Sequence, residues 1–200
     1  MKGVDGPMRK TILCISLLIT LALFGCADKK QEIVAYVGDV PITMAEFEFY
    51  LDNVKEQLEG TELSDDEDWH NKEIDGRKAI EVAKDRALDN AIVNIAYIKI
   101  YEGLGKNLSS EDKSEIENIK KDIIGEYSEA GYDEFLKENN ITDEFVDMLC
   151  KSTYCAEVLY NDIAQEKGLS NEELDVYFEK YIDEKMKEFG IVASEENISK

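Results

Sequence analysis

The side chains that most often carry out chemistry in proteins are sparse or unpatterned in this chain. A single histidine, His70, occurs among 200 residues, so His-based metal sites and His-dependent catalysis are nearly excluded. The acidic run at residues 65–68 lacks the alternating oxygens, central glycine and distal glutamate of a calcium-binding EF-hand. Glycine-rich phosphate loops and Gly-x-Ser-x-Gly turns are also absent from the sequence. We therefore predict no catalytic residue, no cofactor and no metal site.

The charge of the chain narrows the classes of partner. The sequence has 45 acidic residues against 23 basic ones, which gives a formal net charge of −22. Affinity for phosphate needs clustered lysine and arginine, so we predict no nucleic-acid binding. The same charge argues against docking of the folded part on anionic lipid. A hydrophobic share of 44% with only two prolines indicates a helix-rich globular chain with a core of its own.

Cys26 is a candidate for lipid attachment because of the residues before it. Lys2, Arg9 and Lys10 make the start of the chain basic, and residues 11–24 then form an uncharged run. As a helix this run would span about 21 Å, which is short of the roughly 30 Å hydrocarbon core of a bilayer. A basic start and a short apolar run ending at a small residue are typical of a secretory signal peptide. The alternatives are an uncleaved anchor or a plain secretory signal with a chance cysteine.

The apolar run ends in the letters LFGC, which resemble the lipobox of bacterial lipoproteins. The resemblance implies cleavage before Cys26 and a diacylglyceryl group on its thiol. Phe24 is bulkier than the residue usual at its place in a lipobox. On this basis we expect a signal peptide over residues 1–25 and a tether over residues 26–32. The protein would then be lipid-anchored at the extracytoplasmic face of a bacterial cell membrane.

The other candidate cysteines are Cys150 and Cys155, five residues apart in an expected helix. A helix separates two such Cα atoms by about 7.5 Å along its axis, beyond the limit of roughly 7 Å for a disulfide. No neighbouring histidine or cysteine spacing supports a metal site. We predict that both thiols are small buried apolar side chains.

Cap residues and apolar spacing predict a mainly α fold. Residues 33–37 are β-branched and aromatic and precede Gly38-Asp39, which indicates a short strand and a turn. Thr43 with Glu46 and Ser170 with Glu173 match the capping box that starts a helix. The helices that follow these boxes are expected to end before Gly60 and near residue 188. Further helices are expected over residues 77–104, 109–124, 132–139 and 143–166, with caps at Ser109 and Thr142.

Two stretches of the chain are expected to be irregular or short. Residues 61–76 are predicted to form an acidic loop that Trp69 pins to the body and that exposes His70. Residues 191–193 are predicted to form a strand beside residues 34–37, since neither strand could pair its backbone alone. Residues 194–200 would be a tail.

Three segments in their order resemble the extracytoplasmic foldases and chaperones of the SurA and PrsA type. They read IVAYVGDVPITMAEFEFYL, AKDRALDNAIVNIAYIKIYEGLGKNLSSED and YDEFLKENNITDEFVDMLCKSTYCAEVLYNDIAQEKGLSNEELDVYFEKY. The resemblance covers roughly residues 33–181. It implies a SurA N-terminal-like helical chaperone domain, which we assign to residues 33–193. A small two-stranded sheet from the two ends would close it.

The chain differs from full-length foldases of this type in the segment that follows Tyr181. In full-length foldases of this type, a segment like SNEELDVYFEKY leads into a parvulin domain with prolyl isomerase activity. Here 19 residues follow Tyr181. Parvulin sites typically use histidines, and the single histidine of this sequence, His70, lies in the early acidic stretch. We therefore expect no parvulin domain and no enzymatic activity. Residues 186–193 would be the return of the chain that completes the chaperone domain.

The function expected from these observations is binding of unfolded or partly folded secreted proteins by a membrane-tethered holdase or foldase. Tyrosine suits such contacts, because it joins an apolar ring to a polar tip, although the same rings could simply fill the core. The negative charge favours basic clients. An accessory surface lipoprotein with one dedicated partner and a peptidyl-prolyl isomerase are the alternatives. The candidate client-binding residues are Phe47, Tyr50, Tyr97, Tyr101, Tyr154 and Tyr160.

Overall fold

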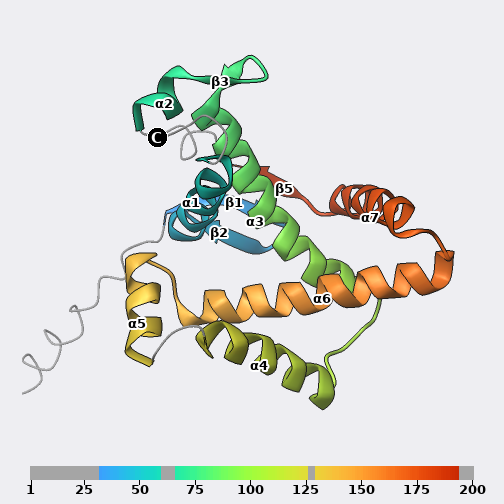
Figure 1. The fold of residues 1–200 in the computed structure, drawn as a ribbon. Coiled ribbons are helices and arrows are strands. Elements are labelled where there is room, and N and C mark those ends of the chain that lie inside the picture. Colours follow the sequence, from blue (N-terminus) through green and yellow to red (C-terminus); the bar gives the residue numbers. More distant parts are fainter. Residues whose placement is uncertain (1–31, 60–65, 126–128, 194–200) are drawn as a thin grey trace, which may run out of the picture. The chain divides into compact units, whose positions relative to one another are not determined.

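The computed structural model describes residues 32–59, 66–125 and 129–193, which are mainly helical (Figure 1). The helices in this part are α1 (Met44–Glu59), α2 (Asp66–Asn71), α3 (Ala79–Gly103), α4 (Ser110–Gly125), α5 (Glu129–Glu138), α6 (Asp143–Lys167) and α7 (Asn171–Met186). The strands are β1 (Ile33–Val37), β2 (Val40–Thr43), β3 (Glu73–Ile74), β4 (Arg77–Lys78) and β5 (Ile191–Ala193).

The predicted caps are present at the starts of the helices. Thr43 donates from its N–H and its hydroxyl to Oε2 of Glu46, at 2.7 and 2.9 Å, and accepts from the Glu46 N–H. Ser109 and Asp112 bond reciprocally before α4, and the Thr142 hydroxyl accepts from the backbone of α6. These bonds satisfy N–H groups that have no partner inside a helix. The cap predictions are confirmed.

The sheet that joins the two ends is larger than predicted. β1 pairs antiparallel with β5, which confirms the expected pairing of residues 191–193 with residues 34–37. The prediction of only two strands was wrong, because β2 pairs with the other side of β1 and gives the order β2-β1-β5. Gly38 makes this possible: its φ of 65° lets the chain reverse within two residues.

The stretch expected to be an acidic loop also contains regular structure. Its described part forms the short helix α2 and the strand β3. β3 pairs with β4 at residues 77–78, which were expected to begin the next helix, so α3 begins two residues later than predicted. Asp75 and Gly76 both have positive φ, 52° and 78°, as a tight hairpin turn requires. The prediction of a loop was therefore wrong here, and the Asp-Gly pair was the signal for the hairpin. Trp69 is buried and His70 exposed, as expected.

Helix α3 passes through the centre of the core. Small residues recur every fourth position on it and are fully buried, at Ala79, Ala83, Ala87 and Ala91. Such a row lets neighbouring helices approach closely. The main cluster joins β1, α1, α3 and the start of α6. A smaller cluster joins the end of α3 to α6 and α7.

Cys150 and Cys155 lie in this interior as free, buried thiols on α6, which confirms the prediction. Burial raises the pKa of the Cys155 thiol to about 11 and raises that of Cys150 as well. Both side chains therefore stay protonated and apolar near neutral pH.

The expected signal peptide (residues 1–25), Cys26, most of the tether and the tail at residues 194–200 lie outside the described residues. None of the helices in the described part combines the length and apolar character of a membrane-spanning helix.

Candidate functional site

The six candidate aromatic residues fall into two classes of burial. Phe47, Tyr50 and Tyr101 are 3%, 6% and 4% exposed, so they belong to the core of the described structure. Client contact through Phe47 or Tyr101 would require local opening of the fold. Tyr50 and Tyr101 each also line a pocket, and the pocket at Tyr50 is the one with almost entirely apolar walls.

The remaining candidates, Tyr97, Tyr154 and Tyr160, are half-buried and already have partners. The Tyr154 hydroxyl donates to Asp112 at 2.5 Å, and the Tyr160 hydroxyl donates to Asp175 at 2.6 Å. These bonds tie α6 to the starts of α4 and α7. The rings of Tyr97 and Tyr160 pack against Phe178 of α7, with centroids 6.0 and 5.2 Å away. The structure gives these three residues a role in joining helices.

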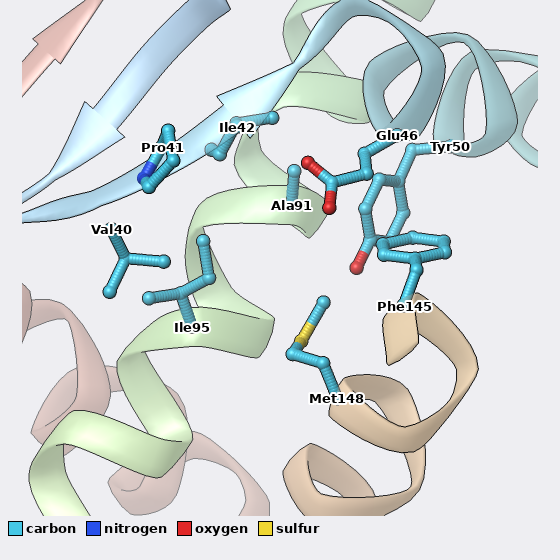
Figure 2. A pocket seen from close by; sticks show the side chains of 9 residues that line it. All are labelled: Val40, Pro41, Ile42, Glu46, Tyr50, Ala91, Ile95, Phe145 and Met148. Atoms are coloured by element: carbon cyan, nitrogen blue, oxygen red, sulfur yellow. The ribbon is translucent and has the colours of Figure 1, made fainter. Parts of the chain in front are cut away.

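A small pocket of about 50 Å³ lies where β2, α1, α3 and α6 meet (Figure 2). Its walls are almost entirely apolar, with the carboxylate of Glu46 and the hydroxyl of Tyr50 as the polar groups. The volume suits one small apolar group. The lining residues are Val40, Pro41, Ile42, Glu46, Tyr50, Ala91, Ile95, Phe145 and Met148.

The hydroxyl of Tyr50 is the distinctive feature of this pocket. It is buried and has no hydrogen-bond partner among the described residues. Figure 2 shows it pointing toward Met148 rather than toward Glu46. The ring is held edge-on against Phe145 and Phe49, at centroid distances of 5.8 and 5.9 Å. An unpaired buried hydroxyl costs about 1–3 kcal/mol, so a ligand that supplies a partner would recover that free energy.

The electrostatic environment keeps this hydroxyl neutral. Burial, followed by the nearby charge of Glu46, raises the pKa of Tyr50 well above its ordinary value. Glu46 is fixed by the two bonds from Thr43, so its carboxylate is committed to the cap of α1. At neutral pH the pocket therefore offers a protonated phenol that can donate or accept one hydrogen bond.

The arrangement fits binding better than bond-breaking chemistry. The carboxylate of Glu46 is bonded to the capping hydroxyl of Thr43, which does not line the pocket, and Tyr50 is held as a neutral group. Within the described residues no three His, Cys, Asp or Glu side chains are grouped to hold a metal ion. The pocket is suited to an apolar group with a hydrogen-bonding group beside it.

Comparison with curated proteins finds a foldase. "Foldase protein PrsA" of Caldanaerobacter subterraneus subsp. tengcongensis is 28% identical to this chain over 153 residues. The chain is similar to PrsA. The match covers 68% of this chain and 49% of that protein, so the chain spans about half the length of the curated relative. No family model matches the chain, and no solved structure matches it.

Similarity to PrsA agrees with the resemblance seen in the three sequence segments. Sequence reasoning selected Tyr50 but treated Glu46 only as a cap, and it did not select Met148 or Ile95. Apolar spacing places such residues on a buried helix face, yet it does not tell which of them border an unfilled space. That the Tyr50 hydroxyl lacks a partner depends on how α3 and α6 pack against β2 and α1, from which they are far apart in the sequence.

Proposed function

We propose that this protein is a chaperone-like holdase or foldase that binds unfolded secreted proteins. A lipid on Cys26 would tether it to the extracytoplasmic face of a bacterial membrane. Similarity to a PrsA foldase supports the chaperone-like role. The single structural observation that carries the proposal is the apolar pocket with the unpartnered hydroxyl of Tyr50.

The pocket matches what every unfolded chain exposes. An apolar side chain of the client would enter between Ile95 and Met148, where the walls are hydrocarbon. A backbone carbonyl next to that side chain would accept a hydrogen bond from Tyr50. Both groups occur in all polypeptides, so such a site recognises the unfolded state rather than one sequence.

The charge of the chain supports the same role. A formal charge of −22 keeps a client-loaded protein soluble and attracts basic clients over long range. We propose further that these 200 residues act by binding alone, without prolyl isomerisation. The single histidine of the sequence, His70, is exposed on α2 and does not line the pocket.

Suppression of aggregation tests the proposal. The full-length chain in detergent micelles is mixed with several unrelated unfolded proteins, and light scattering is followed against empty micelles. We expect slower aggregation of all of them. Tyr50→Phe should weaken the effect by removing the donor, whereas Tyr177→Phe, which changes an exposed tyrosine of α7, should not.

Two outcomes would contradict the proposal. If no unfolded protein is protected, the chain is not a holdase. If it captures one folded partner and ignores unfolded chains, the accessory-lipoprotein alternative is correct. A proline-peptide assay completes the test, because acceleration beyond the uncatalysed isomerisation of tens of seconds would contradict the absence of isomerase activity.

A further inference from the structure

We propose that the open edge of β5 binds an extended, basic segment of the client by adding it to the sheet as a further strand. This inference rests on the proposed function and names a second client site, which shares Pro41 with the lining of the Tyr50 pocket. Three observations carry it: the direction of the backbone groups of β5, an exposed apolar row across the sheet, and the charge of the chain.

The backbone of β5 has groups directed away from β1 that pair with no other strand of the described residues. In an antiparallel ladder, directly opposite residues alternate between hydrogen-bonded and non-bonded pairs. The Gly38 N–H donates to the Gly190 carbonyl at 2.9 Å, which marks that pair as a bonded one. Two residues further along, Tyr36 and Val192 are then also a bonded pair.

It follows that Ile191 and Ala193, opposite Val37 and Ala35, direct their N–H and C=O groups outward. Within the described part of the chain no strand lies on that side of β5. All three β5 residues are exposed, so no described element covers this edge. The edge therefore offers two donors and two acceptors at the spacing of a strand.

The opposite edge of the sheet lacks this capacity. In β2, the residues Val40 and Ile42 face the bonded positions of β1, which leaves Pro41 as the residue that is directed outward. Proline has no N–H, so this edge cannot act as a donor there. Of the two edges of this sheet, the β5 edge is therefore the one that favours strand addition.

An apolar row crosses the outer face of the same sheet. Pro41, Tyr36 and Val192 are direct cross-strand neighbours and project to one face. All three are exposed, with Tyr36 43% and Val192 65% accessible. A strand added beside β5 would extend this row by one more apolar side chain, which contributes specificity for alternating apolar residues.

The net charge of the chain indicates which kind of segment binds at the β5 edge. A second copy of the chain would bring another net charge of −22 to the same edge, and long-range repulsion opposes that contact. A cationic segment is attracted by the same field. The residues of β5 are themselves uncharged, so an added strand meets no desolvated charge. The structure thus favours a client segment that alternates apolar and basic residues.

The experiment uses a fluorescent synthetic peptide of alternating valine and lysine with the full-length chain in micelles. Anisotropy gives its affinity, and amide exchange by NMR reports on Ile191 and Ala193. We expect binding that slows exchange at both amides. A peptide of alternating valine and glutamate, and the basic peptide with N-methylated alternate amides, should bind at least tenfold more weakly.

Ala193→Pro removes an outward donor without touching a β1–β5 bond, and we expect it to weaken peptide binding about tenfold. Val192→Lys should weaken binding as well, because it adds a like charge to the apolar row. Val176→Lys is the matched control: this valine of α7 is 68% exposed, close to the 65% of Val192. It should leave the affinity unchanged.

Unchanged affinity in Ala193→Pro, or no protection of the Ile191 and Ala193 amides, would overturn strand addition. Aggregation suppression that persists in Ala193→Pro would then leave the proposed chaperone function intact. Light scattering with size exclusion covers the other occupant: a dimer of the wild type that Ala193→Pro dissociates would show that the edge pairs with a second copy instead. A monomer supports the client proposal.

Discussion

The hydroxyl of Tyr50 is buried and has no hydrogen-bond partner among the described residues. It lowers the stability of the fold, and in the proposed function it raises the affinity for a client. The core around its ring is well packed by Phe49 and Phe145, so the ring contributes to stability. The hydroxyl opposes it, because it is buried and no group of the described residues bonds to it. A residue that binds ligand at some expense of stability is expected to behave in this way.

We predict that Tyr50→Phe raises the free energy of unfolding by about 1 kcal/mol, since it removes the unpaired hydroxyl and keeps the ring. Urea denaturation followed by circular dichroism measures the change. Tyr36→Phe, with an exposed hydroxyl, should leave stability within about 0.5 kcal/mol of the wild type. A loss of stability in Tyr50→Phe would mean that the hydroxyl has a partner in the free protein.

Asp143 is a carboxylate tied into a network of hydrogen bonds. Its two oxygens accept from Lys120 and Tyr132, at 2.7 and 2.8 Å. The bond from Lys120, and then that from Tyr132, hold the pKa of Asp143 below its ordinary value. A lowered native pKa adds stability above the unfolded pKa of about 3.9. That stability is lost as the pH falls through the native pKa.

We predict that Asp143→Asn destabilises the protein at pH 7 by less than about 1 kcal/mol, because the carboxylate is half exposed. The loss of stability of the wild type below about pH 4 should be shallower in this variant. Thermal melts between pH 2 and 7 provide the measurement. Asp122→Asn, at an exposed position of α4, is the control for the change in charge. If the melting temperatures of Asp143→Asn and of the wild type fall equally below about pH 4, the prediction is wrong.

Helix starts are where single polar side chains act on whole elements. Ser170 donates from its N–H and its hydroxyl to Glu173 at 3.1 and 2.7 Å, before α7. α7 buries only Leu174 and Ile182 fully, so its packing alone holds it weakly. The cap therefore contributes a larger share of its stability than a cap on α3 would.

We predict that Ser170→Ala costs about 1 kcal/mol, detected as a lower midpoint in denaturation and faster amide exchange in the first turn of α7. Ser114→Ala, an exposed serine within α4, should be neutral or slightly stabilising, because alanine is the better helix former. Equal midpoints for Ser170→Ala and wild type would show that α7 does not depend on its cap.

At the scale of the whole molecule, β5 joins the end of the described chain to its beginning. It covers one side of β1, whose Val34 and Val37 are fully buried. Removing β5 would leave β1 with an exposed edge and expose part of that core. The β1–β5 contact therefore links the last helix to the central cluster.

We predict that deleting residues 191–200 lowers the free energy of unfolding by on the order of 2–4 kcal/mol, through lost strand pairing and exposed apolar surface. Deleting residues 194–200 alone is the control and should change little. Native-state amide exchange adds a sharper check: Val192 should be protected, while Ile191 and Ala193 should exchange quickly without a client. Fast exchange at Val192 would contradict the strand pair.

The sequence by itself determined what depends on neighbours along the chain. Thr43, Ser109, Thr142 and Ser170 each lie next to the residues they cap, so their spacing predicted where helices begin. β-Branched residues at the two ends predicted the β1–β5 pair, because a lone strand leaves its backbone unpaired. The Gly38-Asp39 turn and the Asp75-Gly76 pair are also typical of hairpins, and they lie between β1 and β2 and between β3 and β4.

Tertiary structure alone decided which of these features are free for the binding that we propose. Six aromatic residues looked equivalent by spacing, yet packing buried Phe47 and Tyr101, engaged the hydroxyls of Tyr154 and Tyr160, and left that of Tyr50 unpartnered. Likewise the outward direction of Ile191 and Ala193 follows from the register against β1 and not from their own side chains. Both facts depend on contacts between residues far apart in the sequence. The secondary-structure propensities of the residues themselves do not predict such contacts.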